Sequence, residues 1–294
     1  MSTMVPMYGF GGGGGTGAAL TVNAPSGCTV TVSKDGKTKT KVAGTDGVAV
    51  FRGLATGTWT LTISDGEQTA QKTVTVTADY STAITFFEAT IHIIYPAGFT
   101  CTATDGTTTL TAPDTSGTWD CVVPNAGTWT VSLSNGFSET VTISANGETQ
   151  TLNKWYLYNR GDERTYITGG ILVAAEPTYG GSASKNADNI YIGGSVGAFG
   201  GGALSTANSI DLNNFSKLCS VMKAAGDSGN HPVIGVKTGK VYASGSSWKA
   251  NKELPSGAST DQDVIVDISG VSSGYPCIDA WASNATVYEI WLEV

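Results

Sequence analysis

The sequence has little charge, only two histidines, and no basic patch that we recognise. Charged residues make up 14% of the 294 positions, and the formal net charge is −8. A groove for a nucleic-acid backbone needs clustered Lys and Arg, so we expect no nucleic-acid partner. A catalytic triad needs a positioned histidine. His92 and His231 lie far apart, in segments that we assign to different domains.

Long apolar runs are also missing. No stretch approaches the roughly 20 apolar residues of a membrane-spanning helix, so we expect no membrane insertion. Residues 1–10 lack the basic start and apolar run of a secretory signal. We therefore expect a chain made in a bacterial cytoplasm, which is either retained there or carried out as part of an assembly and exposed on its surface.

The cysteines form no metal or redox motif. There are five, at 28, 101, 121, 219 and 277, without a C-x-x-C pair, which argues against zinc and thioredoxin-like sites. Cys101 and Cys121 lie in one repeat, where they can face each other. Buried thiols are the favoured interpretation because a cytosol keeps cysteines reduced, and a disulfide between these two stays open.

Motifs of catalysis are missing as well. The sequence lacks G-x-S-x-G, Walker A, H-E-x-x-H and dinucleotide-binding glycine patterns, which predicts a protein that is not an enzyme. Paired carboxylates would suit a glycan-cleaving enzyme, and the candidates are Asp261, Asp263, Asp267, Asp279 and Glu289. Outward-facing acids on surface strands are the simpler interpretation. Asp261 and Asp263 offer a possible calcium site, and no other cofactor is expected.

What the sequence has is Thr, Gly and alternating apolar residues, which favour strands and tight turns. GTWTLTISDG at 57–66 is echoed by GTWTVSLSNG at 127–136. In the first copy, Trp59, Leu61 and Ile63 alternate with Thr and Ser, the pattern of a half-buried strand. Asp-Gly and Asn-Gly dipeptides then close hairpins. The echo predicts two small β-sandwiches, at 19–88 and 89–154.

These repeats resemble a known module. The run D-G-x-x-x-F-x-G-L-x-x-G-T-W-T-L-T-I at Asp46–Ile63 resembles bacterial carboxypeptidase-regulatory-like domains, which are prealbumin-like and Ig-like. The second copy departs from the pattern, with Cys121 in place of Phe51. The resemblance implies spacer or stalk domains of surface proteins and phage virion proteins.

Residues 155–294 carry short apolar runs at even spacing, which predict a jelly-roll sandwich. In Val264–Ile268, alternation places Ile265 outward. In the last run it predicts Tyr288, Ile290 and Leu292 on one face, with Val287, Glu289, Trp291 and Glu293 on the other. Leu157–Glu163, Ser209–Leu218, Val264–Val271 and Val287–Glu293 resemble a module of phage and prophage tail proteins that is similar to galactose-binding-like jelly rolls.

Two segments outside the repeats are candidate functional sites. Residues 1–18 form a glycine-rich arm. The arm is expected either to be flexible or to dock on a neighbouring subunit. In the second case its assembly anchor would be the apolar residues Met4, Val5, Met7, Tyr8 and Phe10. Sugars bind to aromatic faces and to amides or carboxylates beside them. The candidates in the C-terminal domain are Trp248, Asn251, Tyr275, Asp279 and Trp281, with Trp248 expected in a polar loop. The alternative is that each covers the rim of the core.

Together these features predict a non-enzymatic, all-β structural protein of a phage virion or tail. Its partners are expected to be other virion proteins, bound through the arm, and a host cell-surface glycan. We expect a homo-oligomer whose several copies raise the overall affinity. The alternatives are a purely structural decoration or assembly protein and a glycan-cleaving tail enzyme.

Overall fold

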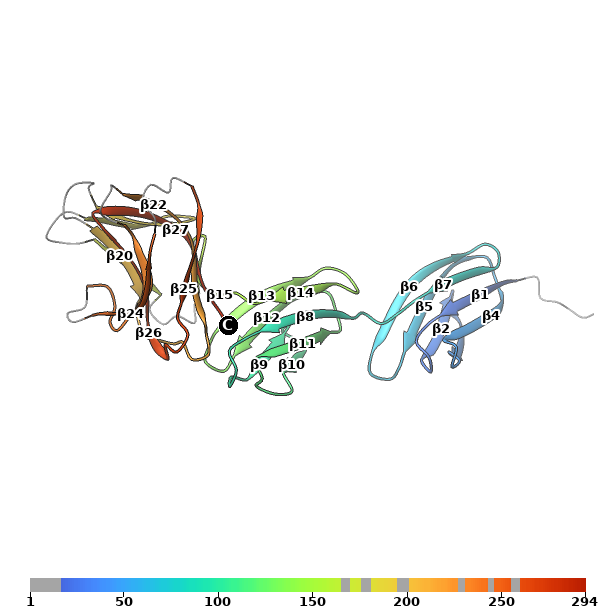
Figure 1. Cartoon of the computed structure of the whole chain (residues 1–294). Coiled ribbons are helices and arrows are strands. Elements are labelled where there is room, and N and C mark those ends of the chain that lie inside the picture. Colours follow the sequence, from blue (N-terminus) through green and yellow to red (C-terminus); the bar gives the residue numbers. More distant parts are fainter. Residues whose placement is uncertain are drawn as a thin grey trace, which may run out of the picture. The chain divides into compact units, whose positions relative to one another are not determined.

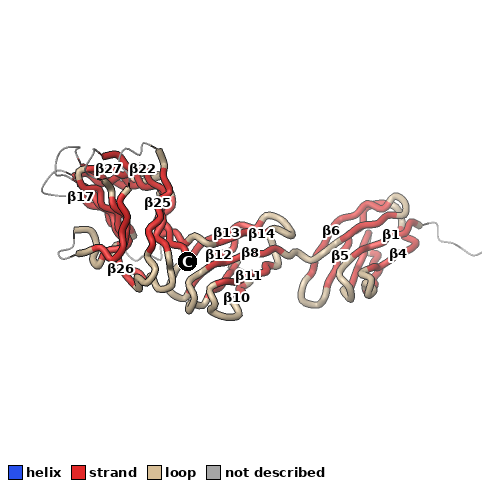
Figure 2. The backbone as a smooth tube through the Cα atoms, viewed as in Figure 1, coloured by secondary structure: helices blue, strands red, loops and turns tan. Residues whose placement is uncertain are grey.

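The computed structural model describes residues 17–164, 170–175, 181–194, 201–226, 231–242, 246–254 and 260–294. Within these ranges every regular element is a β-strand (Figures 1 and 2), and no helix is long and apolar enough to cross a membrane. The predicted all-β class of sandwich domains is confirmed. The chain divides into two compact units, residues 1–88 and residues 89–294. The predicted arm anchor, residues 4–10, lies outside the described residues.

The N-terminal unit is a sandwich of two sheets. The smaller sheet has the order β4 (Val48–Leu54), β1 (Ala18–Asn23), β7 (Tyr80–Ala83), with β1 antiparallel to β4 and parallel to β7. The larger has the order β3 (Lys37–Val42), β2 (Thr29–Lys34), β5 (Gly57–Ser64), β6 (Thr69–Val76). Trp59, Leu61 and Ile63 of β5 are buried between the sheets, on the face that alternation predicts.

A second sandwich with the same strand order opens the other unit. Its sheets have the orders β11 (Thr118–Val123), β8 (Ala89–Ile94), β14 (Thr149–Leu152) and β10 (Thr109–Thr111), β9 (Cys101–Thr104), β12 (Gly127–Leu133), β13 (Ser138–Ile143). The repeated tryptophans make the same hydrogen bond, to the carbonyl four residues earlier in the chain. The indole N–H of Trp59 donates to the carbonyl of Ala55 (2.9 Å), and that of Trp129 donates to the carbonyl of Asn125 (3.3 Å). The two copies therefore share topology and core chemistry.

Two larger sheets form the rest of the chain. One contains β15 (Trp155–Asn159), β16 (Asp162–Glu163), β18 (Gly181–Lys185), β19 (Ile190–Gly194), β22 (Lys217–Gly226), β25 (Gln262–Asp267) and β27 (Ser283–Glu293). The other contains β17 (Ile171–Ala175), β20 (Gly201–Thr206), β21 (Ile210–Asp211), β23 (Val233–Lys237), β24 (Trp248–Glu253) and β26 (Ser273–Trp281). Their apolar faces pack on each other, and β19 contacts β20 and β26 across the core.

Strand β27 corrects one predicted pattern. Its partner β22 pairs Val221 with Glu289 and Met222 with Val287, so Tyr288 is an extra residue at a bulge. A bulge shifts the alternation of side chains by one residue. As a result Val287 faces the core, together with Ile290 and Leu292, whereas Tyr288 does not. Strict alternation had placed Val287 and Tyr288 on the wrong faces.

The second sandwich is bonded to the following domain within their common unit. Arg164 donates to both carboxylate oxygens of Glu139, from Nε to Oε1 (3.1 Å) and from Nη2 to Oε2 (2.8 Å). The backbone N–H of Tyr156 also donates to Glu139 (2.8 Å), and the indole N–H of buried Trp155 donates to the carbonyl of Ile94 (3.0 Å). Burial raises the pKa of Glu139, and Arg164 opposes that rise. These contacts fix the junction.

Candidate functional site

The five residues predicted to bind sugar share one face of the six-stranded sheet. On β26, Pro276, Ile278 and Ala280 are buried toward the core, which turns Tyr275, Asp279 and Trp281 outward. Strand β23 pairs with both neighbours, so its register places the other two candidates on the same side. Lys237 lies opposite both Tyr275 and Trp248, while Gly235 lies opposite both Cys277 and Asn251. The fold thus gathers residues that are far apart in sequence.

A charged network anchors Asp279 on this face. The ammonium group of Lys237 forms an ion pair with Oδ2 of Asp279 and lies 4.4 Å from the ring centroid of Trp248. The thiol of Cys277 donates to Oδ1 of Asp279 (3.3 Å). Burial raises the pKa of Cys277 well above its ordinary value, and the nearby Asp279 adds to the rise. The thiol therefore stays protonated as a donor, and both carboxylate oxygens of Asp279 are held in place.

Two exposed aromatic residues lie in the same hollow as Asp279. Trp281 is 43% exposed and Tyr242 is 49% exposed. Together with Asp279, Ala280, Gly201, Gly202 and Ala203 they line a shallow hollow of about 50 Å³. The segment that carries Tyr242 follows β23 and returns to the sheet, where the N–H of Val241 donates to the hydroxyl of Ser205 (3.1 Å). This return places Tyr242 in the same hollow as Trp281 and Asp279.

The backbone is strained at Tyr242 and directly after Trp281. Tyr242 has a φ of 52°, and Ala282 has a φ of 45°. Residues other than glycine rarely adopt this left-handed conformation, and where they do it often marks a functional site. Glycine is required beside Trp281, because a Cβ on Gly201 would lie 2.8 Å from the carbonyl oxygen of Ala280. Two strained residues and one close backbone approach therefore lie at or beside the hollow.

The other three predicted residues lie farther along the same face. Trp248 is half-buried under the Lys237 ammonium group and begins strand β24, so its predicted position in a polar loop was wrong. Asn251 is exposed, and Tyr275 is half-buried. Only Asp279 and Trp281 of the five line the hollow. The role of all five in binding stays a prediction.

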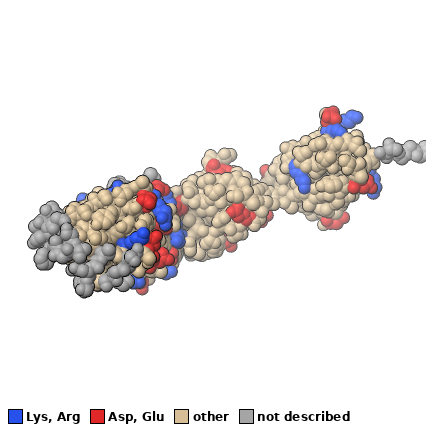
Figure 3. All heavy atoms as spheres, turned by 90° about the horizontal axis from the view of Figure 1, so that it is seen from above, with Lys and Arg blue, Asp and Glu red and all other residues tan. Residues whose placement is uncertain are grey.

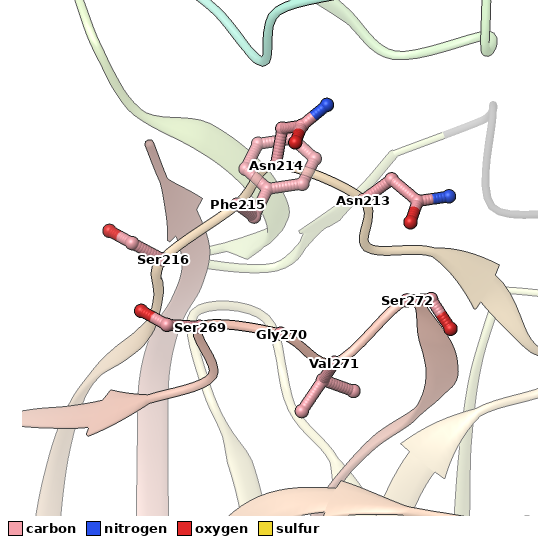
Figure 4. Close-up of a pocket in the computed structure, with 8 residues that line it drawn as sticks. All are labelled: Asn213, Asn214, Phe215, Ser216, Ser269, Gly270, Val271 and Ser272. Atoms are coloured by element: carbon pink, nitrogen blue, oxygen red, sulfur yellow. The ribbon is translucent and has the colours of Figure 1, made fainter.

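A second, larger hollow lies between two loops of the same domain. It has a volume of about 280 Å³ and is lined by residues 213–216 and 269–272 (Figure 4). The side chain of Asn214 donates to the carbonyl of Ala97 in the second sandwich (2.7 Å), and Phe215 packs on Phe137 with ring centroids 5.4 Å apart. Its lining offers hydroxyl and amide groups but no charged side chain. Because Phe215 is buried, the hollow lacks an exposed aromatic platform.

The acidic residues proposed for catalysis are divided between two sheets, although Asp263 and Glu289 both lie opposite Val221 of β22. Asp263 and Asp267 are exposed on β25 of the seven-stranded sheet, whereas Asp279 is on the outer face of the opposite sheet. Glu289 is paired with Arg160 (2.9 Å), and Asp261 with Lys223 (3.4 Å). Within the described ranges, no group of three His, Cys, Asp or Glu residues could hold a metal ion. Asp279 therefore has no catalytic partner among Asp263 and Asp267.

Sequence reasoning missed Tyr242, Lys237 and Cys277. Tyr242 stands in the run TGKVYASG, where an aromatic residue between small and polar neighbours is a weak signal. Nothing local distinguishes Lys237, because its partner Asp279 is 42 positions away and only the register of β23 against β26 brings them together. Cys277 lies two residues from Asp279 on the same strand, so alternation places both on one face, but its sequence gives no sign that its thiol is a buried donor.

No protein-family model matches the chain, and no curated protein matches it. The minor pilin GBS52 of Streptococcus agalactiae is 12% identical, with 46% of this chain and 93% of that chain covered and a TM-score of 0.31. A structure described as one of the carbohydrate-binding modules of the β-sandwich superfamily is 11% identical, with 82% of this chain and 93% of that chain covered and a TM-score of 0.28. The TIE protein of Bacillus anthracis is 9% identical, with 84% of this chain and 43% of that chain covered and a TM-score of 0.21. None of the three is described as a phage protein, and we transfer no function from them.

Proposed function

We propose that the protein is a non-enzymatic adhesion protein whose C-terminal domain binds carbohydrate on the outer face of the six-stranded sheet. The observation that carries this proposal is the hollow that is lined by exposed Trp281 and Tyr242 together with Asp279, whose carboxylate is held by Lys237. Aromatic rings offer apolar platforms to the C–H faces of a sugar, while a carboxylate accepts hydrogen bonds from its hydroxyl groups. The hollow is shallow, which suits one ring of a longer glycan.

A glycan array probed with the full chain tests this proposal. We expect binding that falls at least about ten-fold in Trp281→Ala and in Asp279→Asn, because truncating a central aromatic anchor commonly costs this much. Tyr80→Ala is the matched control, since Tyr80 is a similarly exposed aromatic residue (45%) in the N-terminal unit. Absence of glycan binding, or equal losses in all three variants, would refute the proposal.

We further propose that the protein belongs to a phage virion or tail, as the resemblance of its repeats and C-terminal module suggests. In this proposal the arm of residues 1–18 docks on other virion proteins, and several copies act together on the host surface. Mass spectrometry and immunogold labelling of purified particles test the location. If the C-terminal domain is labelled only after particles are disrupted, the purely structural alternative is favoured over adhesion.

A further inference from the structure

The edge strand β3 carries a row of lysines that faces the interior side of its sheet. Register places Lys37, Lys39 and Lys41 opposite Lys34, Val32 and Val30 of β2, respectively. Val30 and Val32 are buried in the core, so the lysines share the inward side of the sheet while remaining exposed at its edge. We predicted from the sequence that the protein has no basic patch. The structure shows that this prediction was wrong, because the hairpin at Asp35-Gly36 brings Lys34 beside the row of lysines.

Lys34, Lys37 and Lys39 line a groove between the edges of the two sheets, and Lys41 follows them on the same strand edge. Lys39 donates to the carbonyl oxygens of Arg52 (2.7 Å) and Gly53 (3.4 Å) on β4, and Lys34 donates to that of Thr56. The groove has a volume of about 260 Å³, and Asp35 is the only acid among its lining residues, which include Lys34, Lys37 and Lys39. Backbone carbonyls thus position the ammonium groups without neutralising their charge.

Charge pairing differs between the two units. In the described residues, every ion pair lies in the unit of residues 89–294, where Lys185, Lys217, Lys223 and Lys237 each meet a carboxylate. None of the groove lysines is within ion-pair distance of an acid in those residues. In the view of Figure 3, basic and acidic atoms lie both on the N-terminal unit and on the C-terminal domain. The groove therefore holds unneutralised positive charge on a protein of net charge −8.

The second sandwich shows that the fold does not require these lysines. Its edge strand β10 pairs Leu110 with Ala103, as β3 pairs Lys39 with Val32. The triplet Thr38-Lys39-Thr40 thus corresponds to Thr109-Leu110-Thr111. Residues 89–153 contain no Lys or Arg. Lysines do protect sheet edges from pairing with other chains, but the second copy retains the same topology with an apolar residue at this position.

We propose that this groove binds an anionic polysaccharide through its carboxylate or phosphate groups. Alternate residues on a strand are about 7 Å apart, so Lys37, Lys39 and Lys41 present charges in a line suited to a linear polymer with regularly spaced anions. A nucleic acid is disfavoured because the groove's aromatic residue, Trp59, is buried and offers no platform for stacking bases. This site is separate from the hollow at Trp281.

Titration calorimetry of the full chain tests the proposal with four probes: polygalacturonate, inorganic polyphosphate, neutral dextran and a single-stranded oligonucleotide. We expect binding of polygalacturonate, polyphosphate or both, weakening as salt rises, and none of dextran. Binding of only one of the two distinguishes carboxylate from phosphate recognition. Each lysine removed should weaken binding about five-fold.

Matched variants separate this site from others. Lys39→Leu introduces the residue of the second sandwich, and Lys34→Gln and Lys37→Gln remove the neighbouring charges. Lys72→Gln is the control, because Lys72 lies on the opposite edge strand and also donates to a backbone carbonyl, that of Ala83. Trp281→Ala should leave polyanion binding unchanged. Failure of both polyanions to bind, an equal loss in Lys72→Gln, or equally tight binding of the oligonucleotide would overturn the proposal.

Discussion

At the scale of single residues, burial controls the chemistry of the cysteines. All five are free and buried in the structure. Burial raises the pKa of Cys101, Cys121 and Cys219 to about 12, and that of Cys28 also rises. Cys101 and Cys121 are close enough for their charges to interact. Because the thiolate is the reactive form of cysteine, these side chains should be inert in the folded protein.

We therefore expect the native protein to resist thiol-modifying reagents at mildly alkaline pH. The measurement is the number of thiols that react with a chromogenic disulfide before and after unfolding in guanidinium chloride. Five thiols should react in the unfolded chain and none rapidly in the native one. Rapid native reaction would contradict the buried positions, while only three thiols in the unfolded, unreduced chain would reveal a disulfide.

Two turn aspartates should make the sandwiches sensitive to acid. Oδ1 of Asp65 accepts from the N–H groups of Glu67 and Gln68, and Oδ1 of Asp105 accepts from those of Thr107 and Thr108. In each case hydrogen bonds lower the pKa; for Asp105 the largest contribution comes from Asn125. A lowered folded-state pKa gives stability that is present above the unfolded pKa and lost as pH falls through the folded one.

Melting temperature measured against pH checks this expectation. Below about pH 4, the unmodified chain should lose stability more steeply than Asp65→Asn or Asp105→Asn, because asparagine does not titrate. At neutral pH each variant should be slightly less stable. Asp120→Asn serves as a control, because the carboxylate of Asp120 pairs with the ring of His92 rather than with turn N–H groups. If the melting temperatures of the unmodified chain and of all three variants fell in parallel with pH, the turn carboxylates would not be the cause of the acid sensitivity.

At the scale of elements, alternation predicts most strands, and pairing explains where it fails. In β5 and β25 the alternating pattern was sufficient to predict the buried face, since Trp59, Leu61, Val264 and Val266 are buried. It failed at Tyr288 because a bulge depends on the register with β22, which a single strand does not encode. Likewise Asp279 and Trp281 were identifiable on β26, but the return of the segment carrying Tyr242 depends on a hydrogen bond to distant Ser205.

Strand β23 gives a prediction at this scale. A Cβ on Gly235 would lie 2.1 Å from the carbonyl oxygen of Ala250 and 2.7 Å from the Cα of Asn251. Gly235→Ala should therefore push β24 away from β23 and cost about 1–3 kcal/mol, the usual range for overpacking. Calorimetry measures the loss, and tryptophan fluorescence should report Trp248 leaving Lys237. An unchanged melting temperature would show that the strands do not approach this closely.

At the scale of the whole molecule, the fixed junction between the second sandwich and the C-terminal domain contains a buried ion pair. The side chain of Glu139 is only 4% exposed, and Arg164 is its cationic partner. Removing one partner of a buried pair leaves an uncompensated charge and commonly costs about 3–5 kcal/mol. Arg164→Ala should therefore destabilise residues 89–294 strongly, whereas the neutral double variant Glu139→Gln/Arg164→Gln should recover part of the loss.

The pH dependence of Arg164→Ala provides the sharper test. Burial already raises the pKa of Glu139, and losing Arg164 should raise it further. A carboxyl group whose pKa is higher in the folded state binds a proton more readily there, so stability falls as pH rises through the interval between the unfolded and folded pKa values. Arg164→Ala should thus be destabilised more at neutral pH than near pH 4 or 5, and Glu139→Gln/Arg164→Gln should lose that dependence. A pH-independent loss in Arg164→Ala would mean that packing of the arginine stem, rather than its charge, holds the junction.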